Sequence, residues 1–291
     1  MKKVIFYLLV IVSGVVMAQQ ESTIGFYQNH LNLVNPAYNS VDGNTYFKTG
    51  VRSQWSGVKE APETQVFSFM TPLSDKISIG ISVINDQVFI EKQTFVSVDF
   101  SYRVQLSNAL NLYMGVKAGA NSYRVNSAGL STFNIVQDPS LGDISRMNPN
   151  VGVGFYLKHE AYFLSVSTPR LLNTERAKNE DGYATVATDR VHYYVSGGYN
   201  FSLSKSLALQ PTFMFRYVGG APVSTDFTAK LVLNDKYQIA ANFRTDNTLG
   251  GLVQLDIYKG TAIGYLYEYA VNSDLLGRSN GSHEFYLQIR F

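Results

Sequence analysis

The chain has 291 residues with 24 Lys and Arg against 22 Asp and Glu, no cysteine, 20 Tyr and 18 Phe. The absence of cysteine excludes a disulfide framework, a thiolate metal site and a cysteine nucleophile. The near-neutral charge excludes the basic surface that nucleic-acid binding requires. Only 16% of the residues are charged and 45% are hydrophobic, so composition and length fit one large all-β domain.

The N-terminus has the pattern of a secretory signal peptide. Lys2 and Lys3 precede an apolar run, residues 4–16, of the length expected for a signal-peptide core, and Ala18 supplies a small residue before a cut. The alternative, a membrane anchor, needs roughly 20 apolar residues. We therefore expect cleavage after Ala18 and an exported mature chain that begins at Gln19. Because Gln19 is not a cysteine, we do not expect a lipoprotein.

Residues 19–44 form a polar, asparagine-rich segment without long alternation. It is too polar for lipid and too rich in Asn for a helix, because Asn favours caps and turns over helix interiors. We expect it either as a plug inside the domain that follows or as a periplasmic segment.

From residue 45 to the end, apolar and polar residues alternate with the period of two that is typical of β-strands. Ile77, Ile79 and Ile81, for example, alternate with Ser78 and Gly80. About 14 such segments are each near the 9–11 residues that cross a bilayer at a tilt. The expected spans are 45–55, 64–71, 76–86, 93–103, 109–123, 149–157, 161–169, 190–201, 206–217, 224–233, 236–245, 248–257, 261–270 and 282–291.

The connections between these segments alternate in length. Links after even-numbered segments are short and turn-like, as in an outer-membrane barrel with short periplasmic turns and longer outer loops. A soluble β-sandwich or propeller, the alternative, has no reason to keep this asymmetry. The long links all follow odd-numbered segments and are expected at 56–63, 87–92, 124–148, 170–189 and 271–281.

The fold that these patterns predict is all-β: a transmembrane outer-membrane β-barrel of about 14 antiparallel strands over residues 45–291. Residues 1–18 are the expected signal peptide and residues 19–44 the expected non-barrel segment. Both ends of the mature chain are expected on the periplasmic side, because the strand number is even.

The last strand carries an alternating apolar face, Phe285, Leu287, Ile289 and Phe291. In lipid every backbone group must be paired, so the last strand has to close against the first. This face, with its terminal Phe, resembles the C-terminal signal that the outer-membrane assembly machinery recognises. We expect these residues to act in barrel assembly.

The sequence favours no catalytic or metal-binding site. The 4 histidines, His30, His159, His192 and His283, lack metal-ligand spacing and are expected at surfaces or interfaces. The glycines of residues 152–154 lie within a strand and indicate close packing rather than a phosphate loop. We expect no enzyme activity, no metal and no cofactor.

Charged residues on the faces opposite the apolar ones are expected to line the lumen. They form either a selective pore or a salt-bridged interior, and their balanced signs fit mutual pairing better than a filter of one sign. They are Asp99, Arg103, Lys117, Lys230, Arg244, Asp256, Glu268, Glu284 and Arg290.

Aromatic girdles at the membrane interfaces are expected from Tyr162, Tyr193, Tyr199, Tyr217, Tyr265, Tyr267 and Tyr269.

Short motifs precede the barrel and open its first strands. They are Asn35-Pro36-Ala37-Tyr38, Arg52-Ser53-Gln54-Trp55, Ala61-Pro62-Glu63-Thr64 and Asn85-Asp86. In this order, after a signal peptide, they resemble the PorP/SprF family of outer-membrane proteins of Bacteroidota. The resemblance implies a type IX secretion component, either of the core machinery or of the kind that supports export or surface attachment of a gliding-type adhesin. The implied partners are that adhesin or another secreted protein, periplasmic secretion components and outer-membrane lipid.

The motif residues are the candidate site, expected to bind a partner, to fix the plug and the first hairpin, or both. They are Asn35, Pro36, Ala37, Tyr38, Arg52, Gln54, Trp55, Pro62 and Thr64. Asn before Pro favours an extended or turn geometry, and Tyr38 is expected to pack the segment against the lumen. Strand parity points Arg52 and Gln54 inward, where Arg52 can pair with a carboxylate, and Trp55 toward lipid.

Two other functions fit the same barrel. One is a substrate-specific outer-membrane channel for small hydrophobic or sugar-like solutes. The other is a structural anchor that holds periplasmic secretion machinery to the membrane through the short turns and residues 19–44.

Overall fold

The computed structural model describes residues 24–126, 143–175, 188–258, 260–271 and 279–291. No helix within these ranges is long and apolar enough to cross a membrane. The elements are α2 (Leu31–Val34), β1 (Tyr46–Ser53), β2 (Glu63–Pro72), β3 (Ile77–Val88), β4 (Glu91–Gln105), β5 (Leu110–Val125), β6 (Ile144–His159), β7 (Tyr162–Thr168), β8 (Thr174–Glu175), β9 (Thr188–Asp189), β10 (His192–Tyr199), β11 (Phe201–Ser202), β12 (Leu207–Val218), β13 (Ser224–Leu233), β14 (Tyr237–Arg244), β15 (Thr248–Tyr258), β16 (Thr261–Ala270) and β17 (Ser282–Arg290).

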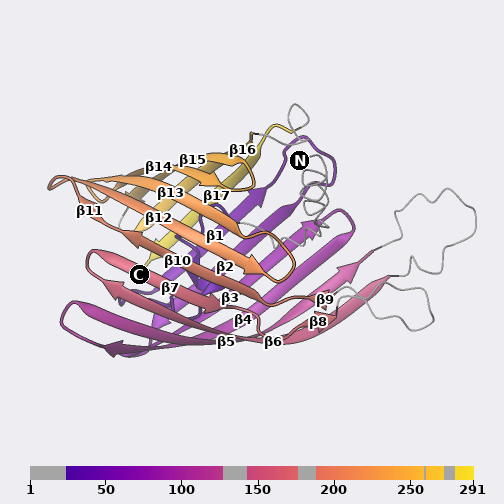
Figure 1. The fold of residues 1–291 in the computed structure, drawn as a ribbon, viewed down its shortest axis with the longest axis horizontal. Coiled ribbons are helices and arrows are strands. Elements are labelled where there is room, and N and C mark those ends of the chain that lie inside the picture. Colours follow the sequence, from indigo (N-terminus) through magenta and orange to yellow (C-terminus); the bar gives the residue numbers. More distant parts are fainter. Residues whose placement is uncertain (1–23, 127–142, 176–187, 259, 272–278) are drawn as a thin grey trace, which may run out of the picture.

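The strands form a closed 14-strand antiparallel barrel (Figure 1). β17 pairs with β1, from Tyr46 opposite Arg290 to Ser53 opposite His283, and β10 pairs with β12. The two-residue strand β11 adds to β12 beyond the end of β10. Closure leaves no free edge along the wall, which is the condition for strands in lipid, and the predicted fold class is confirmed.

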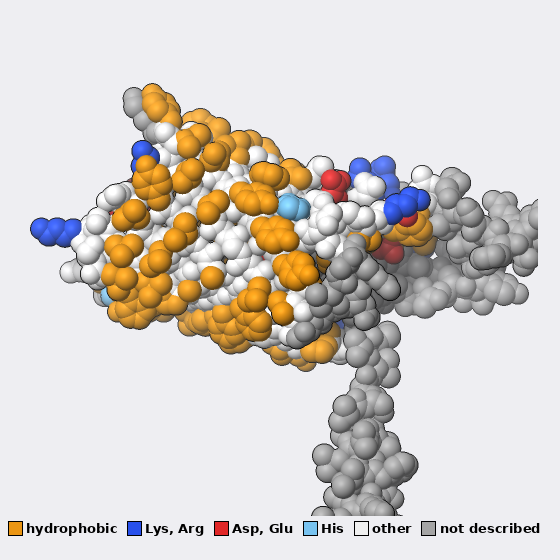
Figure 2. All heavy atoms as spheres, turned by 90° about the horizontal axis from the view of Figure 1, so that it is seen from above, with side chains coloured by type: hydrophobic (Ala, Val, Ile, Leu, Met, Phe, Trp, Pro, Cys, Tyr) orange, Lys and Arg blue, Asp and Glu red, His pale blue; other side chains and the backbone are white. Residues whose placement is uncertain are grey.

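The wall is apolar outside and polar inside, as the alternation predicts. Ile81 and Val98 are exposed on the outer face, whereas their neighbours Ser82 and Ser97 are buried and share a hydrogen bond of 2.8 Å across β3 and β4. On the face seen in Figure 2, hydrophobic side chains cover the barrel wall and charged side chains lie toward its two ends. This pattern is that of a lipid-facing band.

The tyrosines expected in the aromatic girdles lie on the outer face. All are exposed except Tyr265, which is half-buried and bonds through its hydroxyl to His283 Nδ1 at 2.7 Å. Interfacial tyrosines of this kind keep the polar hydroxyl near water while the ring contacts lipid.

The two ends of the barrel differ in their connections. At one end, called here the short-turn end, β2 and β3 are joined by residues 73–76, β4 and β5 by residues 106–109, and β6 and β7 by residues 160–161. The opposite, long-loop end carries residues 54–62 and the connections that follow β5, β7 and β16. This is the asymmetry that the sequence predicts.

Two of the expected long loops are wrong in extent. β3 continues to Val88 and β4 begins at Glu91, so most of the expected loop 87–92 is paired strand and only residues 89 and 90 form a tight hairpin turn. β5 and β6 remain paired up to Val125 and Ile144, which shortens the expected loop 124–148 at both ends; its residues 127–142 lie outside the described ranges. In both places the strands contain polar residues on the outward face, and the alternation that marks a lipid-facing strand is lost.

Candidate functional site

Residues 24–44, called here the plug, lie inside the barrel. At the start of the plug, the N–H groups of Gly25 and Phe26 donate to the Glu284 carboxylate at 2.7 and 3.0 Å. The Phe26 ring stacks on Tyr286 with centroids 5.2 Å apart and fills the space beside Gly264. The plug is therefore fixed to β16 and β17, next to the seam where the barrel closes.

The middle of the plug reaches across the lumen to other strands. Tyr27 Oη and Thr212 Oγ1 are 3.0 Å apart, and Asn29 donates through Nδ2 to Gln254 Oε1 at 2.7 Å. Lys48 Nζ donates to the Asn29 carbonyl at 2.7 Å. These contacts join the plug to β12, β15 and β1.

The plug contains one helical turn, α2, which the sequence did not predict because the segment is rich in Asn. Leu31 and Leu33 are buried in this turn, and the Asn35 N–H closes it by donating to the Leu31 carbonyl at 2.8 Å. Burial of two leucines stabilises a turn that the local propensity alone does not.

Asn35 ends the turn and fixes the motif that follows. Its Oδ1 accepts the Ala37 N–H at 2.9 Å, and its Nδ2 donates to the Phe155 carbonyl at 3.0 Å and to Ser165 Oγ at 2.7 Å. The Asn35 side chain is fully buried. An amide is required here because both its acceptor and its donor are satisfied in a dry site.

The wall facing this motif is made of two glycines, Gly115 and Gly154, which lie directly opposite each other in β5 and β6. We call this pair the glycine seat. A Cβ atom on Gly154 would lie 2.0 Å from Asn35 Oδ1, and one on Gly115 would lie 2.2 Å from the Ala37 nitrogen. The backbone of the plug thus approaches the wall at a distance that only glycine permits, as the sequence prediction of close packing at residues 152–154 indicated.

Tyr38 lies at the short-turn end of the lumen. Its ring meets Tyr156 edge to face, with centroids 5.0 Å apart, and the Lys48 ammonium is 5.7 Å from its ring centre. Burial and the nearby Asp42 carboxylate raise the pKa of Tyr38 to about 12. The expectation that Tyr38 packs the segment against the lumen agrees with this geometry.

An ion-pair network crosses the inner wall near the long-loop end. Arg52 contacts Glu268 and donates to Glu284 at 3.1 Å, and Arg244 donates to Glu268 at 3.0 Å and to Asp226 at 2.7 Å. Arg216 contacts Asp226 and ends the network. The expected pairing of Arg52 with a lumenal carboxylate is present, and the charges neutralise one another.

The other charged residues expected in the lumen differ in how deeply they are buried. Lys117 and Asp99 are buried and paired at 2.9 Å. Arg103, Lys230 and Asp256 are half-buried, and Arg290 is exposed at the short-turn rim. The sequence prediction missed Arg216 and Asp226, although Asp226 has the same strand parity as Lys230 and was open to the same argument.

The remaining motif residues meet at the long-loop end. The Gln54 N–H donates to the Pro62 carbonyl at 2.9 Å, and Thr64 donates to Asp86 Oδ1 at 2.6 Å. The Trp55 N–H donates to Ser282 Oγ at 3.2 Å. The first hairpin is thereby tied to β3 and to the last strand.

Trp55 departs from the parity expectation. β1 ends at Ser53, and Trp55 has a positive φ of 49°, so its side chain does not follow the alternation of the strand. It lines a cavity of about 70 Å³ together with Gln54, Arg52 and Glu268. Trp55 therefore stands at the mouth above the ion-pair network rather than on the lipid face.

One side chain, that of Glu284, contacts both the plug and the long-loop end. Glu284 accepts the N–H groups of Gly25 and Phe26 and also pairs with Arg52, two positions before Gln54. The site residues thus form two groups, the Asn35–Tyr38 motif on the glycine seat and the rim motifs around Trp55, and the Glu284–Arg52 pair connects them.

Comparison with known proteins identifies the family. A model of the type IX secretion system membrane protein PorP/SprF matches residues 16–289. The chain belongs to the PorP/SprF family. No curated protein sequence shows a significant match to it.

Solved outer-membrane proteins share the fold of this PorP/SprF protein at low identity. The Ralstonia pickettii toluene transporter TbuX is 10% identical with a TM-score of 0.52, over 88% of this chain and 92% of that one. A Pseudomonas aeruginosa FadL homologue gives the same values. The CymD monoaromatic hydrocarbon channel is 8% identical with a TM-score of 0.50, over 92% of each chain. At this identity the likeness concerns the fold alone.

Residues 277–281 of the PorP/SprF chain read G-R-S-N-G and match the G-x-S-x-G pattern of a nucleophile elbow. They connect two antiparallel strands, β16 and β17, whereas an elbow joins a strand to a helix. Ser279 Oγ accepts the Gly281 N–H at 3.0 Å, which is a turn interaction. Among the described residues, no group of three or more His, Asp or Glu is placed to hold a metal ion.

His30 is expected to make the seating of the plug sensitive to pH. It is buried against the Tyr286 ring, and neither ring nitrogen has a hydrogen-bond partner within the described residues. Burial and the nearby Lys48 ammonium lower the pKa of His30 to about 3. A displaced plug has a His30 pKa near 6.5, so the displaced state takes up a proton first as pH falls.

Acidification is therefore expected to loosen the plug. Its seating is strongest above pH 6.5 and weakens by about 1.4 kcal/mol per unit below that, or about 2 kcal/mol at pH 5. The measurement is the rate of proteolysis within residues 24–44 at pH 7.5 and pH 5. His30→Phe keeps a ring against Tyr286 and is expected to remove most of this pH dependence; an equal dependence in both proteins would contradict the assignment.

The last strand closes the barrel, and the apolar face expected to act in assembly faces outward. Phe285 and Phe291 are exposed, and Leu287 and Ile289 are half-buried. Because 74% of Phe291 is exposed, truncation of its side chain removes few packing contacts from the folded barrel.

Phe291→Ala is expected to reduce the amount of assembled barrel several-fold while leaving the stability of the assembled fraction unchanged. The readout is the heat-modifiable fraction in electrophoresis of membranes. Phe201→Ala, which truncates another exposed phenylalanine near the short-turn end, is the control. A similar loss in both variants would argue against a specific assembly role for Phe291.

Proposed function

We propose that this PorP/SprF protein docks a secreted protein at the outer membrane and supports its export or its attachment to the cell surface. A gliding-type adhesin is the expected partner. The observation that carries the proposal is the seated plug, which is bound to the wall from Gly25 to Val41. A barrel of this size leaves no path for a folded protein even without a plug, so a docking role fits better than a conduit.

The rim motifs supply the proposed docking surface. Gln54, Trp55 and Pro62 lie at the long-loop end, where the first hairpin is held by hydrogen bonds to neighbouring strands. Trp55 combines an exposed ring with a fixed backbone, a combination common among residues that dominate protein interfaces. A rigid rim binds with little ordering cost.

The cellular setting follows from the family and the sequence. We infer that the long-loop end faces outward and the short-turn end faces the periplasm of a Bacteroidota cell, after removal of residues 1–18. The family, together with barrel neighbours described as transporters and channels, supports a role without catalysis.

The test is purification from native outer membrane in mild detergent, with mass spectrometry of what co-purifies. A large surface protein in stoichiometric amount is expected. The double variant Gln54→Ala with Trp55→Ala is expected to lose this partner while the barrel still folds. Leu73→Ala, which alters an exposed side chain at the short-turn end, serves as the control. Recovery of the barrel alone would contradict docking, and recovery of periplasmic components only would favour the anchoring role.

A second candidate is a substrate-specific channel. Its support is the similarity of the barrel to a toluene transporter and a monoaromatic hydrocarbon channel, and the presence of cavities beside the plug. This function predicts steady conductance in planar bilayers that a small solute blocks, and absence of conductance would count against it.

A further inference from the structure

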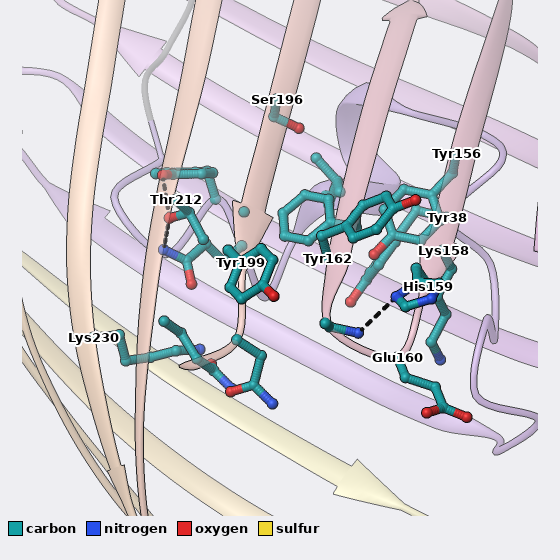
Figure 3. Close-up of a pocket in the computed structure, with 18 residues that line it drawn as sticks. Tyr38, Tyr156, Lys158, His159, Glu160, Tyr162, Ser196, Tyr199, Thr212 and Lys230 are labelled. Carbon is teal, nitrogen blue, oxygen red and sulfur yellow. Dashed lines mark hydrogen bonds between the residues drawn. The ribbon is translucent and has the colours of Figure 1, made fainter. Parts of the chain in front are cut away.

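A cavity of about 290 Å³ lies beside the plug at the short-turn end, between Tyr38 of the plug and the walls formed by β6, β7, β10, β12 and β13 (Figure 3). Part of its lining is aromatic: Tyr27, Tyr38, Tyr156 and Phe163. Tyr156 stacks on Phe163 at 5.5 Å and meets Tyr38 edge to face at 5.0 Å. These rings make an apolar surface of fixed shape.

Four polar groups of the cavity can donate a hydrogen bond and have no partner within the described residues, whereas others, such as Gln28 and Thr212, are paired. Within the described residues, Lys230 Nζ and the hydroxyls of Tyr38, Tyr156 and Ser196 have no hydrogen-bond partner. Ser196 is only 2% exposed. In Figure 3, Lys230 lies on one side of the cavity, Tyr38 and Tyr156 lie on the other, and Ser196 lies above.

Within the described residues, no carboxylate forms an ion pair with Lys230, whereas Lys117 pairs with Asp99. Lys230 faces Gln210 across β12 and β13, and it also lines an adjoining cavity of about 220 Å³ with the neutral amides Gln28 and Gln238 and with the charged residues Asp42 and Lys48. Asp42 accepts a hydrogen bond from the Tyr46 hydroxyl. A half-buried ammonium in such surroundings favours an anion.

The other charges of the cavity are Lys158 and Glu160. Lys158 Nζ donates to the Val41 carbonyl at 3.1 Å and keeps donors to spare. Glu160 lies in the exposed turn between β6 and β7. The lining therefore carries two cations against one carboxylate at the mouth.

We propose that this cavity binds an organic carboxylate that carries a small aromatic or apolar body. The carboxylate accepts from Lys230 on one side of the cavity, and the body lies against the Tyr38, Tyr156 and Phe163 rings on the other side. The volume suits a group of about the size of phenylpropionate, since sites for larger ligands begin near 300 Å³. The same chemistry is present in a free organic acid and in the C-terminal residue of a peptide. The site stands on its own geometry and is independent of the proposed docking at the opposite end.

The test is isothermal titration calorimetry of the purified barrel in detergent with 3-phenylpropionate. Binding is expected, with at least a tenfold loss for Lys230→Met and for the neutral ligand 3-phenylpropanamide. Lys205→Met, in an exposed turn at the same end, is the matched control and is expected to bind as the wild type does. Heat-modifiable migration in electrophoresis checks that each variant is folded.

A second variant and a second ligand complete the experiment. Tyr38→Phe with Tyr156→Phe removes only hydroxyls and keeps the rings, so it is expected to weaken binding much less than Lys230→Met does. The peptide Gly-Gly-Phe, with a free or an amidated C-terminus, separates the sources: tighter binding of the free form than of 3-phenylpropionate assigns the site to a chain end, and weaker or equal binding assigns it to a small acid. If neither acid binds, or if folded Lys230→Met binds as the wild type does, the proposal is overturned.

Discussion

Gly154→Ala is expected to displace the Asn35-Pro36-Ala37 turn from the barrel wall and to release the plug. The added Cβ would lie 2.0 Å from Asn35 Oδ1, so the amide must leave its place between Phe155 and Ser165. Forcing extra atoms into a packed site costs about 1–3 kcal/mol, and each lost hydrogen bond adds about 1 kcal/mol. Gly115→Ala is expected to act in the same direction, because its nearest neighbour is the backbone of Ala37.

The measurement is limited proteolysis of the plug in intact barrels, together with conductance in planar bilayers. Faster cleavage within residues 24–44 and larger or more frequent openings are expected for Gly154→Ala. Gly251→Ala is the matched control, since a Cβ at this strand position in β15 meets no atom within 4 Å. Cleavage and conductance equal to those of the control would show that the glycine seat does not hold the plug.

The barrel was predictable because lipid and lumen make opposite demands on successive residues of a strand. Where both demands act, as in β3 from Ile77 to Val83, the alternation is regular and the predicted span agrees with the structure. Where strands extend past that region, as at Val88 or at Ile144, the outward residues are no longer selected for lipid. The pattern then resembles a loop, although the backbone pairing continues.

Strand parity predicted which way the side chains of the candidate site point, but not which residues they contact. Parity placed Arg52 inward, but its partners Glu268 and Glu284 are 216 and 232 residues away in the sequence. Only the register of β1 with β17, and of β17 with β16, brings them together. The glycines of β5 and β6 indicated close packing, but no local pattern could say that the Asn35 motif is what packs there.

Arg52→Met is expected to be the most damaging single change in the wall. Arg52 and its two carboxylate partners, Glu268 and Glu284, are shielded from water, because the side chain of each is 3% exposed or less. Removal of one partner from a buried pair costs about 3–5 kcal/mol, because an uncompensated charge remains. Glu268 still has Arg244, whereas among the described residues Glu284 keeps only the N–H groups of Gly25 and Phe26. We therefore expect a lower thermal unfolding midpoint and a plug that is cleaved faster at its N-terminal end.

A double-mutant cycle separates the charge from the packing of the side chain. Glu284→Gln in the Arg52→Met background removes the stranded charge and is expected to restore part of the lost stability, although Glu284→Gln alone destabilises the wild type. Lys59→Met breaks a solvent-exposed pair with Glu60 in the loop after β1 and is expected to change nothing measurable. If Arg52→Met is no more damaging than Lys59→Met, the network does not stabilise the closure of the barrel. If the double variant is less stable than Arg52→Met alone, stranding of the Glu284 charge is not the cause of the loss, because its removal would then bring no recovery.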